Sequence, residues 1–316
     1  SPQIPQDRYI SLMEICKFML SDAPEAKISA GDALENFIPT KKFFIPSLSK
    51  ADLVKNGLVK ATDTAMVDND IRFTFPKEIA YKDDLAALNI IAAIAQDGWK
   101  RPIYFGGGLP GDNYEGLEDY MRLEGIVYRL MPFKVRDTLS VPQQDIGSVD
   151  FEKSYDLFVN KYQWGNAQRN DVYFDEKNRI MFTAYRINGG RIANELSMRG
   201  RNKEAIAILD KVTTSITEKS YFYDATIYYV ALAYYRAGEK AKGRDLTMRL
   251  ARNAEKDIDY SLTLSDAARE SMRGDVERDL TIINALRSAA ITGGDAATGK
   301  EMEQKLQILA KKAGVQ

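Results

Sequence analysis

The chain has 316 residues, of which 45% are hydrophobic, and this length predicts two domains with substantial cores. The 44 basic residues are balanced by 45 acidic ones, so no net field attracts nucleic acid, and we expect no nucleic-acid partner. Histidine is absent, which excludes Ser-His-Asp and Cys-His catalysis and most zinc sites, and we expect no metal and no cofactor.

No stretch of the sequence predicts a membrane span or a secretion signal. The longest apolar run, 85–95, contains Asn89 and reaches about half of the ~20 residues that cross a bilayer. The first residues lack the basic segment followed by an apolar one that marks a signal peptide. The single cysteine, Cys16, lies in an apolar pattern that predicts a core position.

The segment 1–148 mixes helical and strand periodicities. Helices are predicted at 8–20 and 81–96. Short strands, several of them stopped by proline, are predicted at 42–45, 71–75, 103–105 and 126–130. We therefore predict a small α+β or α/β domain over 1–148, with its boundary in the polar segment 142–148.

Three glycines follow the predicted strand at 103–105, and Gly106, Gly108 and Gly111 satisfy the G-x-G-x-x-G pattern of dinucleotide-binding loops. Such a loop opens a helix whose amides face a pyrophosphate, whereas Pro110 lacks an amide hydrogen. The acids that follow closely would repel phosphate: Asp112, Glu115, Glu118 and Asp119. This segment is predicted to be a strand exit and turn.

The segment 149–316 is predicted to be all-helical and to contain repeats of the tetratricopeptide type. Three similar segments begin at Gly200, Gly238 and Gly274, and an alanine precedes each glycine by seven residues: Ala193, Ala231 and Ala267. A small residue follows the first two glycines after five positions, Ala205 and Gly243, but Asp279 follows the third, which predicts a degenerate terminal unit. A generic helical bundle remains the alternative, because the intervals exceed the ~34-residue repeat.

The same register predicts a partner-binding groove along the first helix of each unit. Its lining residues are Asn194 and Ser197 in the first unit and Tyr228, Leu232 and Tyr235 in the second, with Arg191 and Arg236 at the rim. The tyrosine rings and hydroxyls suit an extended peptide or a sugar ring. In the alternative interpretation, these rings pack against neighbouring helices, and burial of their hydroxyls decides between the two.

Several motifs together resemble a known family. They are W-K-R-P-I-Y-F at 99–105, Y-x-G-L-x-x-Y-x-x-L-E-G-x-x-Y-R-L-x-P at 114–132, I-P-T-K-K-F at 38–43, K-N-G at 55–57, N-K-Y-Q-W-G-N at 160–166 and D-V-Y-F-D-E-x-N at 171–178. The chain thereby resembles the soluble C-terminal region of Bacteroidetes multi-pass membrane proteins related to protein O-mannosyltransferases. It departs from that family at 219–229, where S-Y-F-Y-D-A-T-I-Y-Y replaces a proline-bearing linker.

The resemblance implies that glycosyl transfer belongs to a separate N-terminal membrane domain and that this region lies on the periplasmic side of the inner membrane. The implied partners are an acceptor protein or peptide, or that membrane domain, and no catalytic residue is implied here. Motif residues are predicted to be structural: Trp99, Arg101, Pro102 and Tyr104 at a helix-to-strand corner, Glu124, Gly125, Tyr128 and Arg129 farther on, and Trp164, Gly165 and Asn166 beyond the domain boundary.

An extended segment over 121–130 would place Glu124 and Arg129 on opposite faces. We therefore predict no ion pair between them and expect Arg122 or Lys134 to neutralise Glu124. Two functions follow as hypotheses. The first is a non-catalytic accessory and interaction domain of a membrane glycosyltransferase. The second is a stand-alone carbohydrate-active enzyme that uses carboxylates such as Glu115, Glu118 or Glu124, for which the sequence places no second acid.

Overall fold

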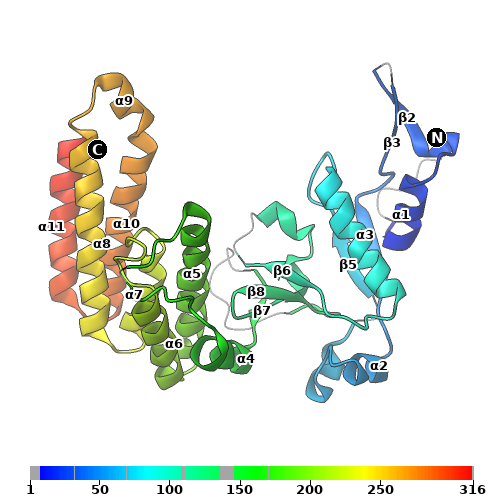
Figure 1. Cartoon of the computed structure of the whole chain (residues 1–316), viewed down its shortest axis with the longest axis horizontal. Coiled ribbons are helices and arrows are strands. Elements are labelled where there is room, and N and C mark those ends of the chain that lie inside the picture. Colours follow the sequence, from blue (N-terminus) through cyan, green and yellow to red (C-terminus); the bar gives the residue numbers. More distant parts are fainter. Residues whose placement is uncertain are drawn as a thin grey trace. The chain divides into compact units, whose positions relative to one another are not determined.

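The computed structural model describes residues 8–31, 33–68, 70–107, 111–135, 146–169 and 171–314. The chain divides into two compact units, 1–150 and 151–316 (Figure 1).

The N-terminal unit begins with a three-stranded sheet. Strand β4 (Lys42–Pro46) lies between β1 (Ile10–Ser11), which is parallel to it, and β5 (Asp70–Thr74), which is antiparallel. Alternate side chains of β4 and β5 point into the core, because side chains alternate along a strand. Helices α1 (Leu12–Met19) and α3 (Lys82–Gln96) pack on each other and against β4.

A second sheet in this unit has the order β6-β8-β7-β9. Its strands are β6 (Tyr104–Gly106), β7 (Met121–Glu124), β8 (Val127–Leu130) and β9 (Ser148–Val149). The unit also contains the hairpin of β2 (Lys27–Ala30) with β3 (Ala33–Asn36), and the short helix α2 (Lys50–Lys55). The Tyr120 hydroxyl donates to the Arg72 carbonyl at 3.2 Å and accepts from the Arg72 amide at 3.0 Å, so it ties the segment before β7 to β5.

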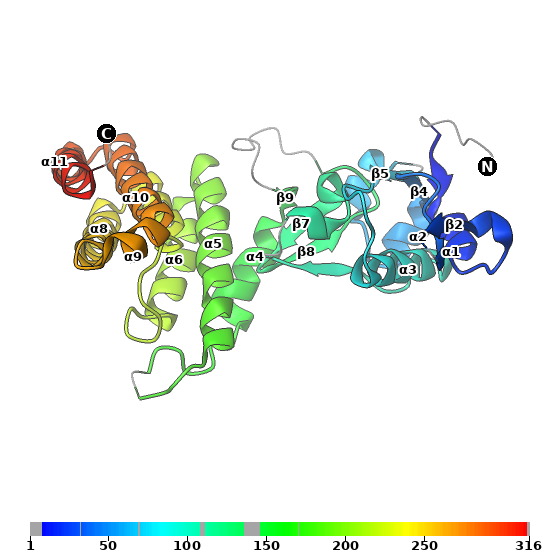
Figure 2. The ribbon, with the colours of Figure 1, turned by 90° about the horizontal axis from the view of Figure 1, so that it is seen from above.

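The elements of the C-terminal unit are all helices within its described residues, and loops join them at 162–175 and 216–226. Its elements are α4 (Phe151–Asp156), which continues into a π-helix (Leu157–Lys161), then α5 (Glu176–Met198), α6 (Asn202–Ser215), α7 (Ile227–Arg236), α8 (Lys240–Ser261), α9 (Asp266–Ser271), α10 (Arg273–Thr292) and α11 (Ala296–Ala313). Helix α5 packs on α6 and α7, α7 on α8 and α10, and α10 on α11. Within this unit the longer helices stand side by side (Figures 1 and 2), and the short α9 joins α8 to α10 at the top of the view in Figure 1.

Two glycines allow α5 to approach its neighbours closely. A Cβ at Gly190 would lie 2.7 Å from the carbonyl carbon of Tyr229 in α7, and a Cβ at Gly189 would lie 2.9 Å from Val212 in α6. Both glycines are buried. The sequence N-G-G-R therefore places two helix-weakening residues where the packing leaves no room for a side chain.

The segment between α6 and α7 is held by Arg186 of α5, which is 0% exposed. Its guanidinium donates to the carbonyls of Tyr221 at 2.7 Å and Phe222 at 2.9 Å and lies 3.6 Å from the Asp224 carboxylate. It also lies over the rings of Tyr221 and Tyr223. Burial lowers the pKa of Arg186, and the charge of Asp224 opposes that shift. This arrangement occupies the stretch where the sequence departs from the family that it resembles.

The described residues confirm small sheets in the first half of the chain and helices in the second. The pairing is mostly antiparallel, so the N-terminal unit is closer to α+β than to α/β. The assignment of the helical half to tetratricopeptide repeats stays a prediction. Its third unit was placed wrongly, because Gly274 lies within the first turn of α10 and Ala267 is exposed on α9.

The turn that matches Gly200 and Gly238 is at Gly294. All three have a left-handed φ, of 75°, 89° and 74°, and each separates two helices. Five residues after Gly294 comes the buried Gly299, just as the buried Ala205 and Gly243 follow the earlier turns. The long helix α8 and the inserted α9 displaced this turn from the interval that the sequence suggested.

Candidate functional site

The first candidate residues lie at the corner after α3. Gly98 and Trp99 both adopt a left-handed φ, of 75° and 52°, and the Trp99 amide donates to the Ile94 carbonyl at 2.9 Å. The Trp99 ring is 1% exposed, whereas Arg101, Pro102 and Tyr104 are exposed. Trp99 is therefore a core anchor that fixes the direction in which the chain enters β6.

Glu124 has the partner that the sequence analysis excluded. The segment 121–130 is a hairpin rather than one strand, because the chain turns at Gly125 and Ile126 between β7 and β8. Glu124 Oε1 lies 3.6 Å from Arg129 Nη1, and Glu124 Oε2 accepts from the Tyr104 hydroxyl at 3.0 Å. The predicted absence of this ion pair was therefore wrong.

The alternative partners of Glu124 were wrong as well. Arg122 lies 3.5 Å from Asp63, and Lys134 lies 3.1 Å from Asp119. Arg129 also donates to the Gly57 carbonyl at 2.8 Å, and Tyr128 is buried against Tyr114. Glu124 is 2% exposed and is held by Arg129 and Tyr104. It therefore has a structural role, because it stabilises the sheet and the contact of the sheet with the turn after α2.

A second carboxylate does lie near one of the acids named from the sequence. Glu115 is 3% exposed and Asp84 is 2% exposed. Asp84 accepts from the Tyr81 amide at 2.7 Å and from Lys77 Nζ at 2.5 Å, and Lys77 also donates to the Asn113 side chain at 3.3 Å. Burial and the charge of Asp84 raise the pKa of Glu115 to about 7, although the charge of Lys77 opposes the shift.

This cluster could not be predicted from the sequence, because Lys77, Asp84 and Glu115 come from three separate segments. The signal that could have indicated it is the acid at the third position of α3, which caps that helix. The backbone at Glu115 has a left-handed φ of 59°, which is strained for a side chain of this size. Strain and a raised pKa often mark a functional site. Here the low exposure of both acids keeps them from direct contact with a substrate.

The raised pKa of Glu115 predicts a pH dependence of stability. The unfolded carboxyl titrates near its ordinary 4.5 and the folded one near 7, so the unfolded chain releases this proton first as the pH rises. The contribution of Glu115 to stability is therefore fully present below pH 4.5 and is lost as the pH rises through 7. We expect Glu115→Gln to reduce the fall in unfolding free energy between about pH 5 and pH 8 by on the order of 2 kcal/mol.

Urea unfolding across this pH range measures the effect. Glu35→Gln, on the exposed strand β3, is the control and should leave the pH dependence of the wild type unchanged. A Glu115→Gln protein with the same pH dependence as the wild type would show that this carboxyl is not held protonated in the fold.

The groove residues predicted in the helical unit lie at the contacts among α5, α7 and α10. Tyr235 is 2% exposed and packs with Ala289 and Ala290 of α10, and Tyr228 and Leu232 pack against the same cluster. Arg191 is buried and lies 3.2 Å from Glu195. Tyr235 therefore serves the packing of two helices, as the alternative interpretation had it, and its hydroxyl is closed to a ligand.

Other members of that set remain partly accessible. Arg236 donates to the Asn194 side chain at 2.7 Å and to the Met198 sulfur at 3.6 Å, which joins α7 to α5. Ser197, Tyr228, Leu232 and Arg236 are half-buried, whereas Tyr229 is 43% and Met198 38% exposed. We call the surface formed by Met198, Tyr228, Tyr229, Leu232 and Arg236 the α5–α7 strip, and the buried Asn194 holds Arg236 in it. Tyr229 and Met198 were not predicted for the groove, because the repeat register assigned them to no groove position.

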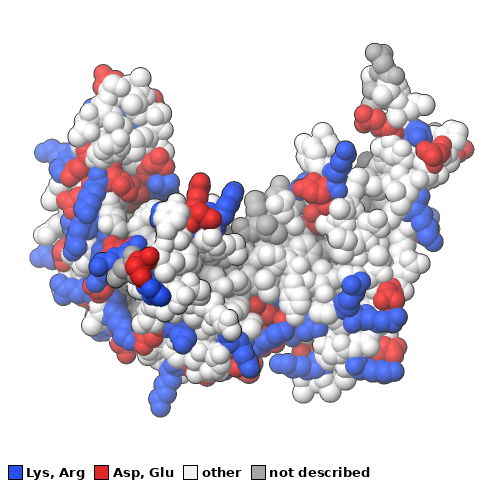
Figure 3. Space-filling model, in the orientation of Figure 1, with Lys and Arg blue, Asp and Glu red and all other residues white. Residues whose placement is uncertain are grey.

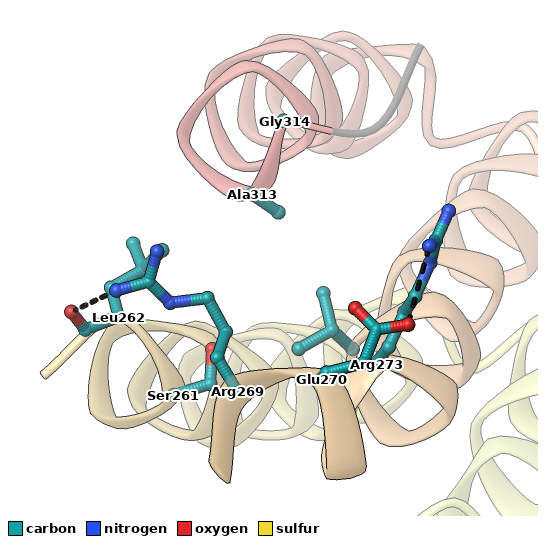
Figure 4. Close-up of a pocket in the computed structure, with 8 residues that line it drawn as sticks. Ser261, Leu262, Arg269, Glu270, Arg273, Ala313 and Gly314 are labelled. Carbon is teal, nitrogen blue, oxygen red and sulfur yellow. Dashed lines mark hydrogen bonds and ion pairs between the residues drawn. The ribbon is translucent and has the colours of Figure 1, made fainter. Parts of the chain in front are cut away.

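A hollow of about 220 Å³ lies among the C-terminal ends of α8, α9 and α11 and the first turn of α10 (Figure 4). Arg269 and Arg273 stand on opposite sides of it, and Ala313 and Gly314 face them from the end of α11. Arg269 donates to the Leu262 carbonyl at 3.3 Å, and Arg273 lies 3.6 Å from Glu270 and 3.2 Å from Glu277. Arg269 also lies 3.8 Å from Asp266. These acids compensate the basic charge of both arginines, so the hollow offers little attraction for an anion.

The described residues give no cluster of acids or cysteine that could hold a metal ion, and none of their helices is long and apolar enough to cross a membrane. On the face shown in Figure 3, charges of both signs alternate, except that basic side chains gather over α2. Lys50, Lys55 and Lys60 are exposed there. A contact on this face would depend on local shape and chemistry more than on a long-range field.

Comparison with known protein families gives a match to the N-terminal half of the chain. Residues 2–153 match the family described as TMEM260-associated domain 2. The match spans the N-terminal unit, with the corner at Trp99 and the Glu124–Arg129 pair inside it. No curated protein and no solved structure matches the chain.

Proposed function

We propose that the chain is a non-catalytic accessory region of a membrane protein O-glycosyltransferase, and that its helical unit binds acceptor protein or peptide. The observation that carries this proposal is the match of residues 2–153 to a TMEM260-associated domain, because TMEM260 is a family related to protein O-mannosyltransferases. The proposed location is the periplasmic side of the inner membrane. The membrane domain that performs the transfer is the proposed partner of the N-terminal unit.

The α5–α7 strip supports acceptor binding by the helical unit. It combines the aromatic rings of Tyr228 and Tyr229, which lie 5.6 Å apart, with the thioether of Met198 and the guanidinium of Arg236. Aromatic, methionine and arginine side chains are enriched at protein interfaces. Methionine adapts to varied partners because its side chain is flexible. Such a surface suits an enzyme system that must accept many different polypeptides.

The alternative function is a stand-alone carbohydrate-active enzyme. The pairing of Glu124 with Arg129 and Tyr104 weakens the form of this hypothesis that relied on Glu124. The Asp84–Glu115 pair is the observation that favours the hypothesis, since catalytic acids often have a raised pKa. Its burial argues against it, because a general acid must come within hydrogen-bond reach of its substrate.

We therefore expect the purified chain to show no turnover of nitrophenyl glycosides or of a lipid-linked sugar donor. Release of nitrophenol, and transfer of labelled sugar to a peptide, measure the two activities. The non-catalytic assignment would be overturned if the chain showed turnover and Glu115→Gln or Glu124→Gln abolished it. The variant would have to keep a thermal midpoint within a few degrees of the wild type, and the result would then support the alternative.

A further inference from the structure

A polar hollow lies beside Trp164 in the helical unit, and none of its lining residues belongs to the α5–α7 strip. Its volume is about 600 Å³, which is within the range of about 300 to 1,000 Å³ for small-molecule sites. The residues that line it are Gln163, Trp164, Gly165, Asn166, Gln168, Lys211 and Ser215. The first five follow the π-helix directly, and the last two lie on α6.

The indole of Trp164 is held in place by other rings. Its centroid lies 5.0 Å from that of Tyr185, 6.2 Å from Tyr162 and 6.3 Å from Phe158. The ring is only partly exposed, so it forms one wall of the hollow while the aromatic cluster fixes its orientation. A binding surface of this kind loses little side-chain entropy when a ligand settles on it.

The backbone after Trp164 makes a tight turn whose residues line the same hollow. Gly165 and Asn166 both adopt a left-handed φ, of 58° and 62°. The next residue, Ala167, is 0% exposed and packs in a core cluster with Phe182 and Ile216. The turn is thus anchored at Ala167, and the exposed side chains of Asn166 and Gln168 flank this anchor.

The polar groups of the hollow are not engaged by the fold. Within the part of the chain that the structure describes, the amide side chains of Gln163, Asn166 and Gln168 have no hydrogen-bond partner, and Lys211 has no ion-pair partner. None of the lining residues is acidic. The hollow therefore combines an aromatic wall, three free amides and one positive charge.

We propose that this hollow binds carbohydrate, as one or two sugar units. The C–H face of a sugar ring can lie on an indole, and its hydroxyls both donate and accept hydrogen bonds, as amide side chains do. Lys211 adds a donor that favours an acidic sugar. An extended peptide fits less well, because its side chains need apolar pockets, and the lining contains one hydrophobic side chain, that of Trp164.

This inference goes beyond the proposed function and does not depend on it, because it rests on the residues of one hollow. The two proposals can also be refuted independently of each other. The hollow is tested with free sugars and the purified chain, whereas acceptor binding is tested on the α5–α7 strip. A helical unit could hold a glycan in this hollow whether or not the strip holds a polypeptide.

The test is saturation-transfer NMR on the purified chain with methyl glycosides of mannose, glucose, galactose, N-acetylglucosamine and glucuronic acid. We expect transfer to at least one of them. Two variants should weaken its affinity at least about tenfold, which is 1.4 kcal/mol. One is Asn166→Gly, which removes the amide and keeps the left-handed backbone. The other is the double variant Gln168→Ala with Lys211→Ala, whose side chains the fold does not use.

Matched controls are Gln304→Ala on α11 and Lys203→Ala on α6, both at exposed positions, and these should bind as the wild type does. All variants should keep the thermal midpoint of the wild type. The proposal is overturned if no glycoside receives saturation, or if both the Asn166→Gly variant and the double variant bind glycoside as the wild type does. It is also overturned if a Gly-Ser-Thr peptide binds in this hollow and the glycosides do not.

Discussion

Replacing Arg186 by methionine should lower the free energy of unfolding by about 3 to 5 kcal/mol, the usual loss when one member of a buried charged pair is removed. The guanidinium is 0% exposed and holds two backbone carbonyls and the Asp224 carboxylate. Methionine would fill much of the volume but would leave the carbonyls of Tyr221 and Phe222 without this donor, and each unsatisfied acceptor costs about 1 to 3 kcal/mol. Asp224 would keep the Tyr221 hydroxyl and the Thr226 amide as donors.

Urea unfolding followed by circular dichroism measures this change. Arg179→Met is the matched control on the same helix, because Arg179 is exposed and only stacks on the ring of Tyr173. The control should change stability by no more than about 0.5 kcal/mol. Equal stabilities of the two variants would mean that Arg186 does not organise the segment between α6 and α7.

Replacing Gly190 by leucine should destabilise the helical unit by about 3 kcal/mol or more, at the upper end of the range for overpacking. Its first side-chain atom would lie 2.7 Å from the backbone of Tyr229. A backbone contact cannot be relieved by rotating one flexible side chain, so α5 and α7 would have to separate. The contacts of Arg236 with Asn194 and Met198, which join the same two helices, would be strained as well.

Gly274→Ala is the matched control for Gly190. Gly274 also lies in a helix, but a Cβ there would meet no atom within 4 Å. Alanine should therefore leave the stability unchanged or raise it by up to about 1 kcal/mol, because it favours the helix. If the thermal midpoints of Gly190→Leu and Gly274→Ala agreed, the close approach of α5 and α7 would be contradicted.

Apolar periodicity in the sequence predicted the helices and strands that bury one face, because a buried face requires apolar residues at regular spacing. The segment 81–96 became α3 because Leu88, Ile91 and Ala92 form its buried face. The β2–β3 hairpin was missed, since the described side chains of β3 are all exposed and give no alternation. The α2 helix was also missed, although Ser49 accepts a hydrogen bond from the Asp52 amide, and this capping pattern was visible in the sequence.

The candidate site was harder to predict because its contacts join distant segments. A strand period of two placed Glu124 and Arg129 on opposite faces, and a single turn at Gly125 reversed that conclusion. Arg186 looks like a surface residue in a helical pattern, and only the carbonyls of Tyr221 and Phe222 explain its burial. The third helical turn was misplaced because glycine spacing cannot reveal an inserted helix such as α9.

The most direct test of the accessory assignment is transfer of sugar to a protein acceptor by the membrane glycosyltransferase to which we propose that this chain belongs. The measurement is the intact mass of the acceptor after reaction. The double variant Tyr229→Ala with Met198→Ala alters the α5–α7 strip, Tyr260→Ala is an exposed control on α8, and Glu115→Gln tests the buried acid. We predict that the strip variant modifies the acceptor at least about tenfold more slowly, a loss of 1.4 kcal/mol, while the other two match the wild type. Full activity of the strip variant together with loss of activity in Glu115→Gln would contradict the account.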